Sequence, residues 1–180
     1  MTCTVSPSDR WQNITVAISK ELSCLAESER QWIEQQITHI HHLQRQLHDL
    51  FVHGQGLLHC QKCLGSCCER GNNHMTLANV LSGLLDRTLP AADFSQTCPF
   101  LTQKGCSLRV ESRPYNCVTF ICDTIEECLN AEELDQFYTL ERQLREHYIA
   151  FDQRYIGSSL QGLLIRSQSM PGNQYLAHRI

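Results

Sequence analysis

Residues 28–52 read SERQWIEQQITHIHHLQRQLHDLFV, and this stretch carries the clearest structural signal in the chain. Apolar side chains recur in it at Ile33, Ile40 and Leu47, with Leu43 and Leu50 at the second position of the repeat. This spacing places them along one face of an α-helix. Ser28 followed by Gln31 resembles a capping box, and glycine at 54 and 56 ends the pattern. The sequence therefore predicts a helix over 28–52, roughly 37 Å long at ~1.5 Å per residue.

A helix with one apolar face needs a partner, and a second seam lies near the other end of the chain. Asn130 and Glu133 have capping-box spacing. The apolar positions that follow are Leu134, Phe137, Leu144, Tyr148, Phe151 and Tyr155. We therefore predict that the two long helices pack against each other. Pairing of helix 28–52 with its counterpart in a second copy is the alternative.

The segment between the long helices has a different composition. Residues 54–128 are rich in glycine, cysteine, asparagine and proline, with a short helix predicted over 76–86 and a short strand over 118–121. Another helix is predicted over 9–26. So irregular a region lacks regular packing of its own, and a bound metal would supply the missing stabilisation.

These patterns predict a mainly α fold, in which two long amphipathic helices pack around an irregular, metal-organised cysteine-rich region. Three segments are expected: an N-terminal helical segment 1–53, a metal-binding cysteine-cluster region 54–128, and a C-terminal helix and tail 129–180. We expect them to form one compact domain, because 180 residues is the size of a single domain.

Composition excludes several classes of protein. Apolar residues make up 42% of the chain and charged residues 19%, which argues against general disorder. The net charge is −4 with only three lysines, so we expect no nucleic-acid partner. No apolar run approaches the ~20 residues that span a bilayer, so no membrane partner is expected. Residues 1–5 show neither a basic nor an apolar leader, and we expect a cytoplasmic protein.

Eleven cysteines are the outstanding feature of the composition. Structural disulfides are rare in a reducing cytoplasm, so metal ligands and buried thiols are the main interpretations. Cys3, Cys24 and Cys128 are isolated, and we expect them to be small buried side chains or unreactive surface thiols. The remaining eight, predicted to ligate metal, are Cys60, Cys63, Cys67, Cys68, Cys98, Cys106, Cys117 and Cys122.

Eight thiolates can fill two four-cysteine sites, or one site with several bystanders. Zinc takes four ligands in a tetrahedron, and iron–sulfur clusters also take four cysteines. Adjacent Cys67 and Cys68 tend to point apart, so they serve two centres or only one of them is a ligand. Either metal favours thiolates, and its binding releases protons and is coupled to folding.

The order of these motifs resembles the YkgJ-type cysteine-cluster proteins. C-x2-C-x3-C-C at 60–68 is followed by C-P-F-L from Cys98, G-C at Cys106 and R-P-x-x-C ending at Cys117. The resemblance covers residues 60–122 and implies a small bacterial protein that chelates zinc or iron. It implies Cys122 as a ligand together with the seven other cysteines of this stretch, which are Cys60, Cys63, Cys67, Cys68, Cys98, Cys106 and Cys117.

A more distant similarity links C-x3-C-C and C-P-F-L to the cysteine-rich part of flagellin lysine-N-methylase, whose cysteines are associated with an iron–sulfur centre. This chain lacks the rest of such an enzyme, so the catalytic role is not carried over. The chain has no phosphate-binding glycine loop, nucleophile elbow or zincin motif. We therefore predict no catalytic residue.

Histidines and arginines near the cysteines have two interpretations each. Six histidines between 39 and 59 are expected to form a polar helix face rather than a second metal site. His59 and His74 are ordinary loop residues or partners of the cysteine ligands. Arg109 and Arg113 bracket the turn before Cys117, where they are surface residues, or offset thiolate charge, or bind an anionic substrate.

The predicted function is metal binding through the cysteine cluster, with zinc or iron as the cofactor and a structural, trafficking or sensing role. One alternative is an iron–sulfur protein in electron transfer or in a redox-assisted modification. The other is a helical interaction module with a metal-stabilised loop, which binds a protein partner or a second copy through helix 28–52.

Overall fold

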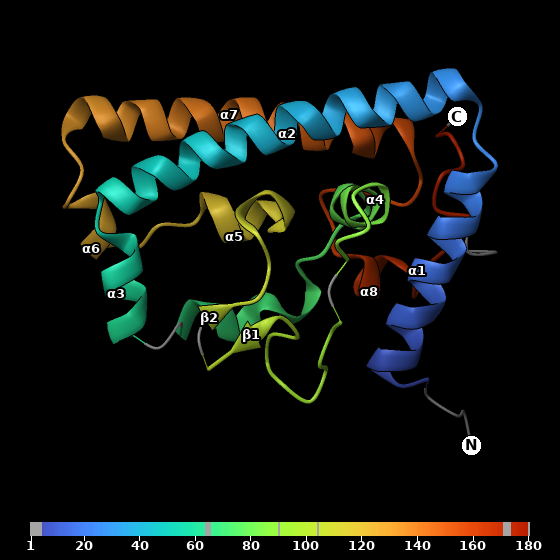
Figure 1. Ribbon diagram of the computed structural model, residues 1–180, viewed down its shortest axis with the longest axis horizontal. Helices are drawn as coiled ribbons and strands as arrows, with labels where there is room; N and C mark the ends of the chain where they lie inside the picture. Colours follow the sequence, from blue (N-terminus) through green and yellow to red (C-terminus); the bar gives the residue numbers. More distant parts are fainter. Residues whose placement is uncertain (1–4, 64–65, 90, 104, 171–173, 180) are drawn as a thin grey trace.

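The computed structural model describes residues 5–63, 66–89, 91–103, 105–170 and 174–179, without the side chains of Cys67, Glu69, Arg70 and Asn72. The described part is mainly helical, with one small antiparallel sheet (Figure 1). The helices are α1 (Pro7–Ser23), α2 (Glu27–His53), α3 (Gly56–Lys62), α4 (Leu77–Leu85), α5 (Tyr115–Thr119), α6 (Asp123–Glu126), α7 (Ala131–Arg154) and α8 (Leu163–Arg166). The shorter elements are the 3-10 turns η1 (Ser66–Asn73) and η2 (Val110–Ser112) and the strands β1 (Leu101–Thr102) and β2 (Gly105–Cys106).

The two long helices α2 and α7 form the frame of the molecule. They lie side by side in Figure 1 and contact each other along their length. Glu29 near the start of α2 pairs with Arg154 at the end of α7, so the two helices are antiparallel. The predicted packing of two long helices is therefore confirmed. The apolar face of α2 is covered within this chain, by α7, α4 and η2.

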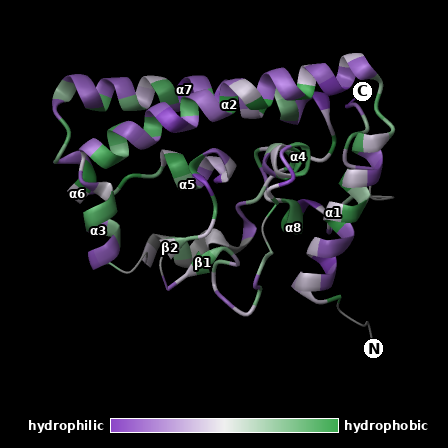
Figure 2. Cartoon of the chain, in the orientation of Figure 1, coloured by the Kyte–Doolittle hydropathy of each residue, from purple (hydrophilic) through white to green (hydrophobic). Residues whose placement is uncertain are grey.

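Apolar side chains fill the interface between these helices and the elements beneath them. Fully or nearly fully buried side chains on the two long helices include Ile33, Ile37, Ile40, Leu47, Phe137, Leu144, Tyr148 and Phe151. Hydrophilic residues cover much of the remaining surface of both helices (Figure 2). Among the described residues, no helix combines the length and the apolar character that a membrane span requires.

Helix boundaries follow local capping chemistry. The Asn130 side chain accepts hydrogen bonds from the backbone N–H groups of Glu132 and Glu133, and the Glu133 side chain accepts from the Asn130 N–H, as the sequence predicts. α2 instead begins at Glu27, one residue before the predicted start, with Ala26 as its N-cap. The predicted capping box at Ser28 is therefore wrong. The Gln31 amide donates to the Glu27 carboxylate rather than serving a cap.

α4 anchors the middle of the chain in the core. Its predicted position is confirmed: Thr76 caps it in a capping box with Asn79, and Asp86 follows its last residue. Leu77, Val80 and Leu81 are fully buried, and α4 contacts α1, α2 and α7. Part of the cysteine-rich region is therefore held by ordinary apolar packing.

The strand predicted over 118–121 is wrong, because residues 115–119 form α5. Pro114 precedes the helix with an extended backbone, and the Thr119 hydroxyl donates to the Tyr115 carbonyl. A strand of four residues needs a neighbour for its backbone groups, whereas a helical turn satisfies them locally. No described strand lies beside this segment.

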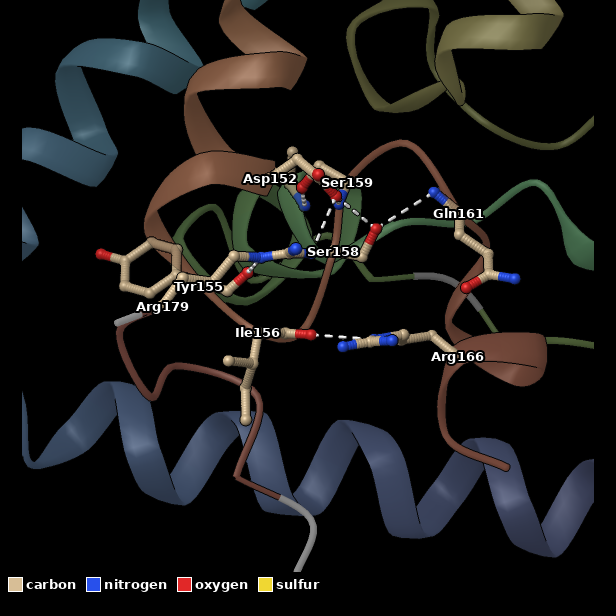
Figure 3. A network of polar contacts seen from close by, with 9 residues as sticks. Asp152, Tyr155, Ile156, Ser158, Ser159, Gln161, Arg166 and Arg179 are labelled. Carbon is tan, nitrogen blue, oxygen red and sulfur yellow. Dashed lines mark hydrogen bonds and ion pairs between the residues drawn. The ribbon is translucent and has the colours of Figure 1, made fainter. Parts of the chain in front are cut away.

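The C-terminal tail folds back onto the end of α7. Figure 3 shows the polar contacts that hold it. The Arg166 guanidinium donates to the Ile156 carbonyl at 2.9 Å, and that of Arg179 donates to the Tyr155 carbonyl at 3.1 Å. Ser158 donates to the Asp152 carboxylate, which also accepts from the Ser159 N–H. The tail thereby completes the core below α7.

Candidate functional site

A small hairpin brings two of the candidate ligands together. Leu101 pairs with Cys106 and Thr102 with Gly105, and the Ser107 N–H donates to the Phe100 carbonyl at 2.8 Å. Gly105 has a φ of +101°, which glycine adopts readily and other residues rarely do. The chain therefore reverses between Cys98 and Cys106, and the charges of these two cysteines interact.

Cys98 occupies a buried position at the base of this hairpin. Burial raises the pKa of its thiol, as does a charge on Cys106, whereas hydrogen bonds from the backbone of Phe100 and Leu101 lower it. Gly71 of η1 packs against the sulfur so closely that a Cβ there would lie 2.8 Å from Sγ. Cys98 thus lies between η1 and its own turn, with backbone donors directed at the sulfur.

The third element of the site is α5, and a buried polar contact sets its position. The side-chain amides of Gln44 and Asn79 both donate to the Arg113 carbonyl, at 2.7 Å and 3.1 Å. Asn79 also contacts the fully buried Tyr148 hydroxyl at 3.2 Å. Side chains of two helices, α2 and α4, therefore hold the residue that precedes Pro114, and α5 presents Cys117 from this position.

Cys117 is the centre of a group of four cysteines from four elements. Part of this residue reaches solvent, but its thiol is largely enclosed, and burial raises the pKa of Cys117 to about 12. Charges on Cys106, Cys98 and Cys68 raise that pKa further, whereas the Arg113 guanidinium lowers it. We call Cys68, Cys98, Cys106 and Cys117 the cysteine group. Arg113 thus lies close enough for its charge to favour the Cys117 thiolate, which agrees with one of the roles open from the sequence.

His74 adjoins this group. Its Nδ1 lies 3.4 Å from the Cys117 sulfur, and burial lowers its pKa, which favours a neutral imidazole. Arg109, by contrast, faces Glu111 at 4.0 Å and lies apart from these contacts. The sequence left the role of His74 open, and the structure places it beside a candidate ligand.

The other predicted ligands occupy different positions. Cys60 and Cys63 belong to the α3 region, where the Cys63 thiol faces the Cys60 carbonyl at 3.6 Å, and Cys122 is the N-cap of α6. The Cys67 side chain and residue Cys3 lie outside the described residues.

Sequence reasoning missed one cysteine contact. The sequence pattern predicts Cys128 to be isolated, but its sulfur lies 3.7 Å from His59 Nε2. The two residues are 69 positions apart in the chain, and α3 contacts α6 near them. Only their types, a thiol and an imidazole, hinted at such a contact.

No complete ligand set is present among the described side chains. Within the described ranges, no group of three or more His, Cys, Asp or Glu residues is arranged so that it could hold a metal ion. No disulfide joins Cys98, Cys106, Cys117, Cys122 or Cys128 to a described cysteine. The donor types nevertheless suit zinc or iron, because thiolate sulfur and imidazole nitrogen are preferred ligands of both.

The histidines of α2 lie mostly at packing contacts rather than on a purely polar face. His41 Nε2 lies 2.8 Å from the Ser82 hydroxyl, the His48 ring stacks on Phe51, and His39 stacks on His147 of α7. His41 and His48 are half-buried at the margin of the polar face, whereas His39 is exposed, as the expectation of a polar face requires. Their neighbours on α4 and α7 lie too far along the chain for a sequence pattern to reveal.

Comparison with family models, with curated proteins and with solved structures finds no match to this chain. The resemblance to the YkgJ-type proteins therefore stays a prediction that rests on the order of the cysteine motifs.

Proposed function

We propose that this protein binds zinc or iron through the thiolates of Cys68, Cys98, Cys106 and Cys117, in a structural, trafficking or sensing role. Their described positions do not form a ligand set, so the proposal requires that the ion draws the four sulfurs together when it binds. What supports the proposal is that Cys68, Cys98 and Cys106 lie near enough to Cys117 for their charges to raise its pKa. These residues come from η1, the Cys98 turn, β2 and α5, so the fold gathers cysteines that are up to 49 positions apart.

Charge explains why such a group favours a cation. Four neighbouring thiolates repel one another, and this repulsion adds to the burial that keeps the Cys117 thiol protonated. A bound divalent cation would reverse both effects, since it stabilises the thiolate form and releases the protons. Backbone donors at Cys98 and the Arg113 guanidinium already act in the same direction.

The remaining cysteines extend the proposal. Cys60, Cys63 and Cys67 precede Cys68 in the C-x2-C-x3-C-C motif, and Cys122 follows Cys117 by five residues. A second centre, or a single centre with exchange among ligands, would use them. An iron–sulfur cluster takes the same four-cysteine set as zinc, and hydrogen bonds to its sulfurs tune its potential. Cys98 has donors of this kind.

The test is the composition of protein purified without oxygen: zinc, iron, acid-labile sulfide and the visible absorption spectrum. Colourless protein with stoichiometric zinc would support a chelating or structural site. Brown protein with roughly equal iron and sulfide would support a cluster and redox chemistry. Folded protein that contains neither metal, and takes up neither Zn²⁺ nor Fe²⁺ after anaerobic reduction, would overturn the proposal.

A further inference from the structure

A polar cavity of about 230 Å³ lies beside the cysteine group. Its lining comes from four parts of the chain, and the residues that matter here are Asn73, His74, Tyr115, Asn116, Arg145 and Ser159. His74 connects it to the cysteine group, because its imidazole lines the cavity and contacts the Cys117 sulfur at 3.4 Å. Asn116 is the chain neighbour of Cys117 in α5.

The charge of the cavity is positive. Arg145 of α7 lines it, and no aspartate or glutamate is among its lining residues. Arg145 forms no ion pair with any residue in the described part of the chain. The nearest acidic residue on the same face of α7 is Glu141, one turn earlier, and its carboxylate accepts a hydrogen bond from the Tyr115 hydroxyl. The guanidinium is therefore available to an anionic ligand.

Hydrogen-bond donors add to this charge. The side-chain amides of Asn73 and Asn116 make no hydrogen bond to the described residues, so their N–H groups are available to a ligand. The Ser159 hydroxyl oxygen accepts from the Ala78 N–H at 3.3 Å, and its own proton has no described acceptor. Ser159 is only 1% exposed, so its hydroxyl is available only to a group that enters the cavity. A guanidinium with amide and hydroxyl donors is a common recognition set for oxyanions.

We propose that this cavity binds a small molecule through a phosphate or carboxylate group, held by Arg145 with Asn73, Asn116 and Ser159 around it. The volume is below the roughly 300–1,000 Å³ of pockets that hold drug-sized ligands, so the ligand is small. The inference does not depend on the metal, since none of the four residues is a proposed metal ligand. Because His74 touches both sites, the ligand would lie beside the residue that contacts Cys117.

The experiment is calorimetric titration of the intact protein with inorganic phosphate and, separately, with succinate. Arg145→Gln should weaken binding at least tenfold, because no other arginine or lysine is among the described residues that line the cavity. Arg142→Gln is the matched control: it lies on the same helix, is exposed and donates only to the Thr139 hydroxyl among the described residues. Asn116→Ala provides a second, exposed position at which the affinity should fall.

Saturable binding of phosphate alone would assign a phosphate ligand, and binding of succinate alone would assign a carboxylate. Absence of saturable binding for both anions, or equal affinities in the Arg145→Gln and Arg142→Gln proteins, would overturn the inference. The metal content of each variant should equal that of the unmodified protein. This measurement separates the two proposals, because loss of anion binding with metal retained bears on the cavity alone.

Discussion

The Nδ1 atom of His74 lies 3.4 Å from the Sγ of Cys117, although 43 residues separate them in the chain. His74 lies between η1 and α4, whereas Cys117 belongs to α5. The contact therefore joins the segment that carries Cys68 to the helix that carries Cys117. His74 also lines the polar cavity, so it lies between that cavity and the cysteine group.

Replacement of Cys117 by serine should remove most of the bound metal. Cys117 is the residue to which the other three thiols are coupled, and an incomplete ligand set loses much of its binding free energy. The measurement is the metal-to-protein ratio after anaerobic purification. Cys24→Ser is the control, because Cys24 is exposed at the end of α1, where it faces the Ser23 hydroxyl. Equal metal loss in both variants would contradict the ligand assignment.

Replacement of Gln44 by alanine should destabilise the protein by about 2 kcal/mol. The change removes a fully buried donor at 2.7 Å from the Arg113 carbonyl and leaves a cavity under α5. Urea unfolding measures the loss, and the metal content should fall with it because α5 carries Cys117. Gln35→Ala, at an exposed position of the same helix, should change the free energy of unfolding by less than about 0.5 kcal/mol. If Gln44→Ala were as stable as Gln35→Ala, Gln44 would not be a residue that positions α5.

Replacement of Glu29 by glutamine should weaken the attachment of the C-terminal tail. The Glu29 carboxylate accepts two hydrogen bonds of 2.6 Å from Arg154 and one of 2.5 Å from the Tyr155 hydroxyl, with His178 at 3.1 Å. Arg154 is the main cause that lowers the pKa of Glu29 to about 2. Because Arg154 is one-third exposed, water screens this ion pair. We therefore expect the free energy of unfolding to fall by about 2 kcal/mol near neutral pH, which is less than the full pKa shift of Glu29 would give.

The sign of the pH dependence follows from that lowered pKa. The contribution of Glu29 is fully present above its unfolded pKa of 4.5 and is lost as the pH falls towards 2. The difference in unfolding free energy between the unmodified protein and Glu29→Gln should therefore shrink between about pH 5 and pH 2. Glu34→Gln, an exposed change on the same helix, should leave the pH dependence of the unfolding free energy in this range unchanged. A constant difference across this range would show that Glu29 does not titrate as described.

The stacked pair of His39 and His147 should make stability fall in mildly acidic solution. The rings are 5.2 Å apart, Gln36 Oε1 lies 2.8 Å from His147 Nδ1, and burial together with His39 lowers the pKa of His147, which Glu146 partly opposes. A lowered pKa means that the unfolded chain binds the proton more readily, so stability decreases as the pH falls below 6.5. His41, His48 and His74 add to this slope with the same sign.

The measurement is the unfolding free energy between about pH 5 and pH 8 for His147→Gln and for the unmodified protein. The variant should show a shallower slope, because one proton-binding site of the unfolded chain is gone. His42→Gln, at an exposed position of α2, is the control and should retain the original slope. An unchanged slope in His147→Gln would assign the pH dependence to the other histidines.

Local sequence patterns predicted the frame of the fold well. The seam from Ile33 to Leu47, the cap at Asn130 and the short helix after Thr76 all depend on residues within a few positions of each other, and all three are present. The predictions at Ser28 and at 118–121 failed where a neighbouring residue competed. Ala26 became the cap of α2, and Pro114 began a helix where β-branched residues suggested a strand.

The candidate site was predictable in composition but not in arrangement. The sequence identified eight cysteines, and four of them form the coupled group, but it did not indicate which four. It also gave no sign that Cys128 faces His59, or that Arg145 lines a cavity with His74. These contacts join α3 to the segment between α6 and α7, and α7 to the segment before α4, so no spacing rule applies to them.

The sequence by itself determined the helical class, the two long amphipathic helices and the chemical character of the middle region, because periodicity, capping and thiol content are local properties. Tertiary structure alone decided which cysteines meet. Gln44 and Asn79 reach from α2 and α4 to the Arg113 carbonyl and set the position of Cys117, while Gly71 allows η1 to approach Cys98. Such positions arise from the simultaneous packing of several elements, so no short segment of the sequence specifies which cysteines lie close together.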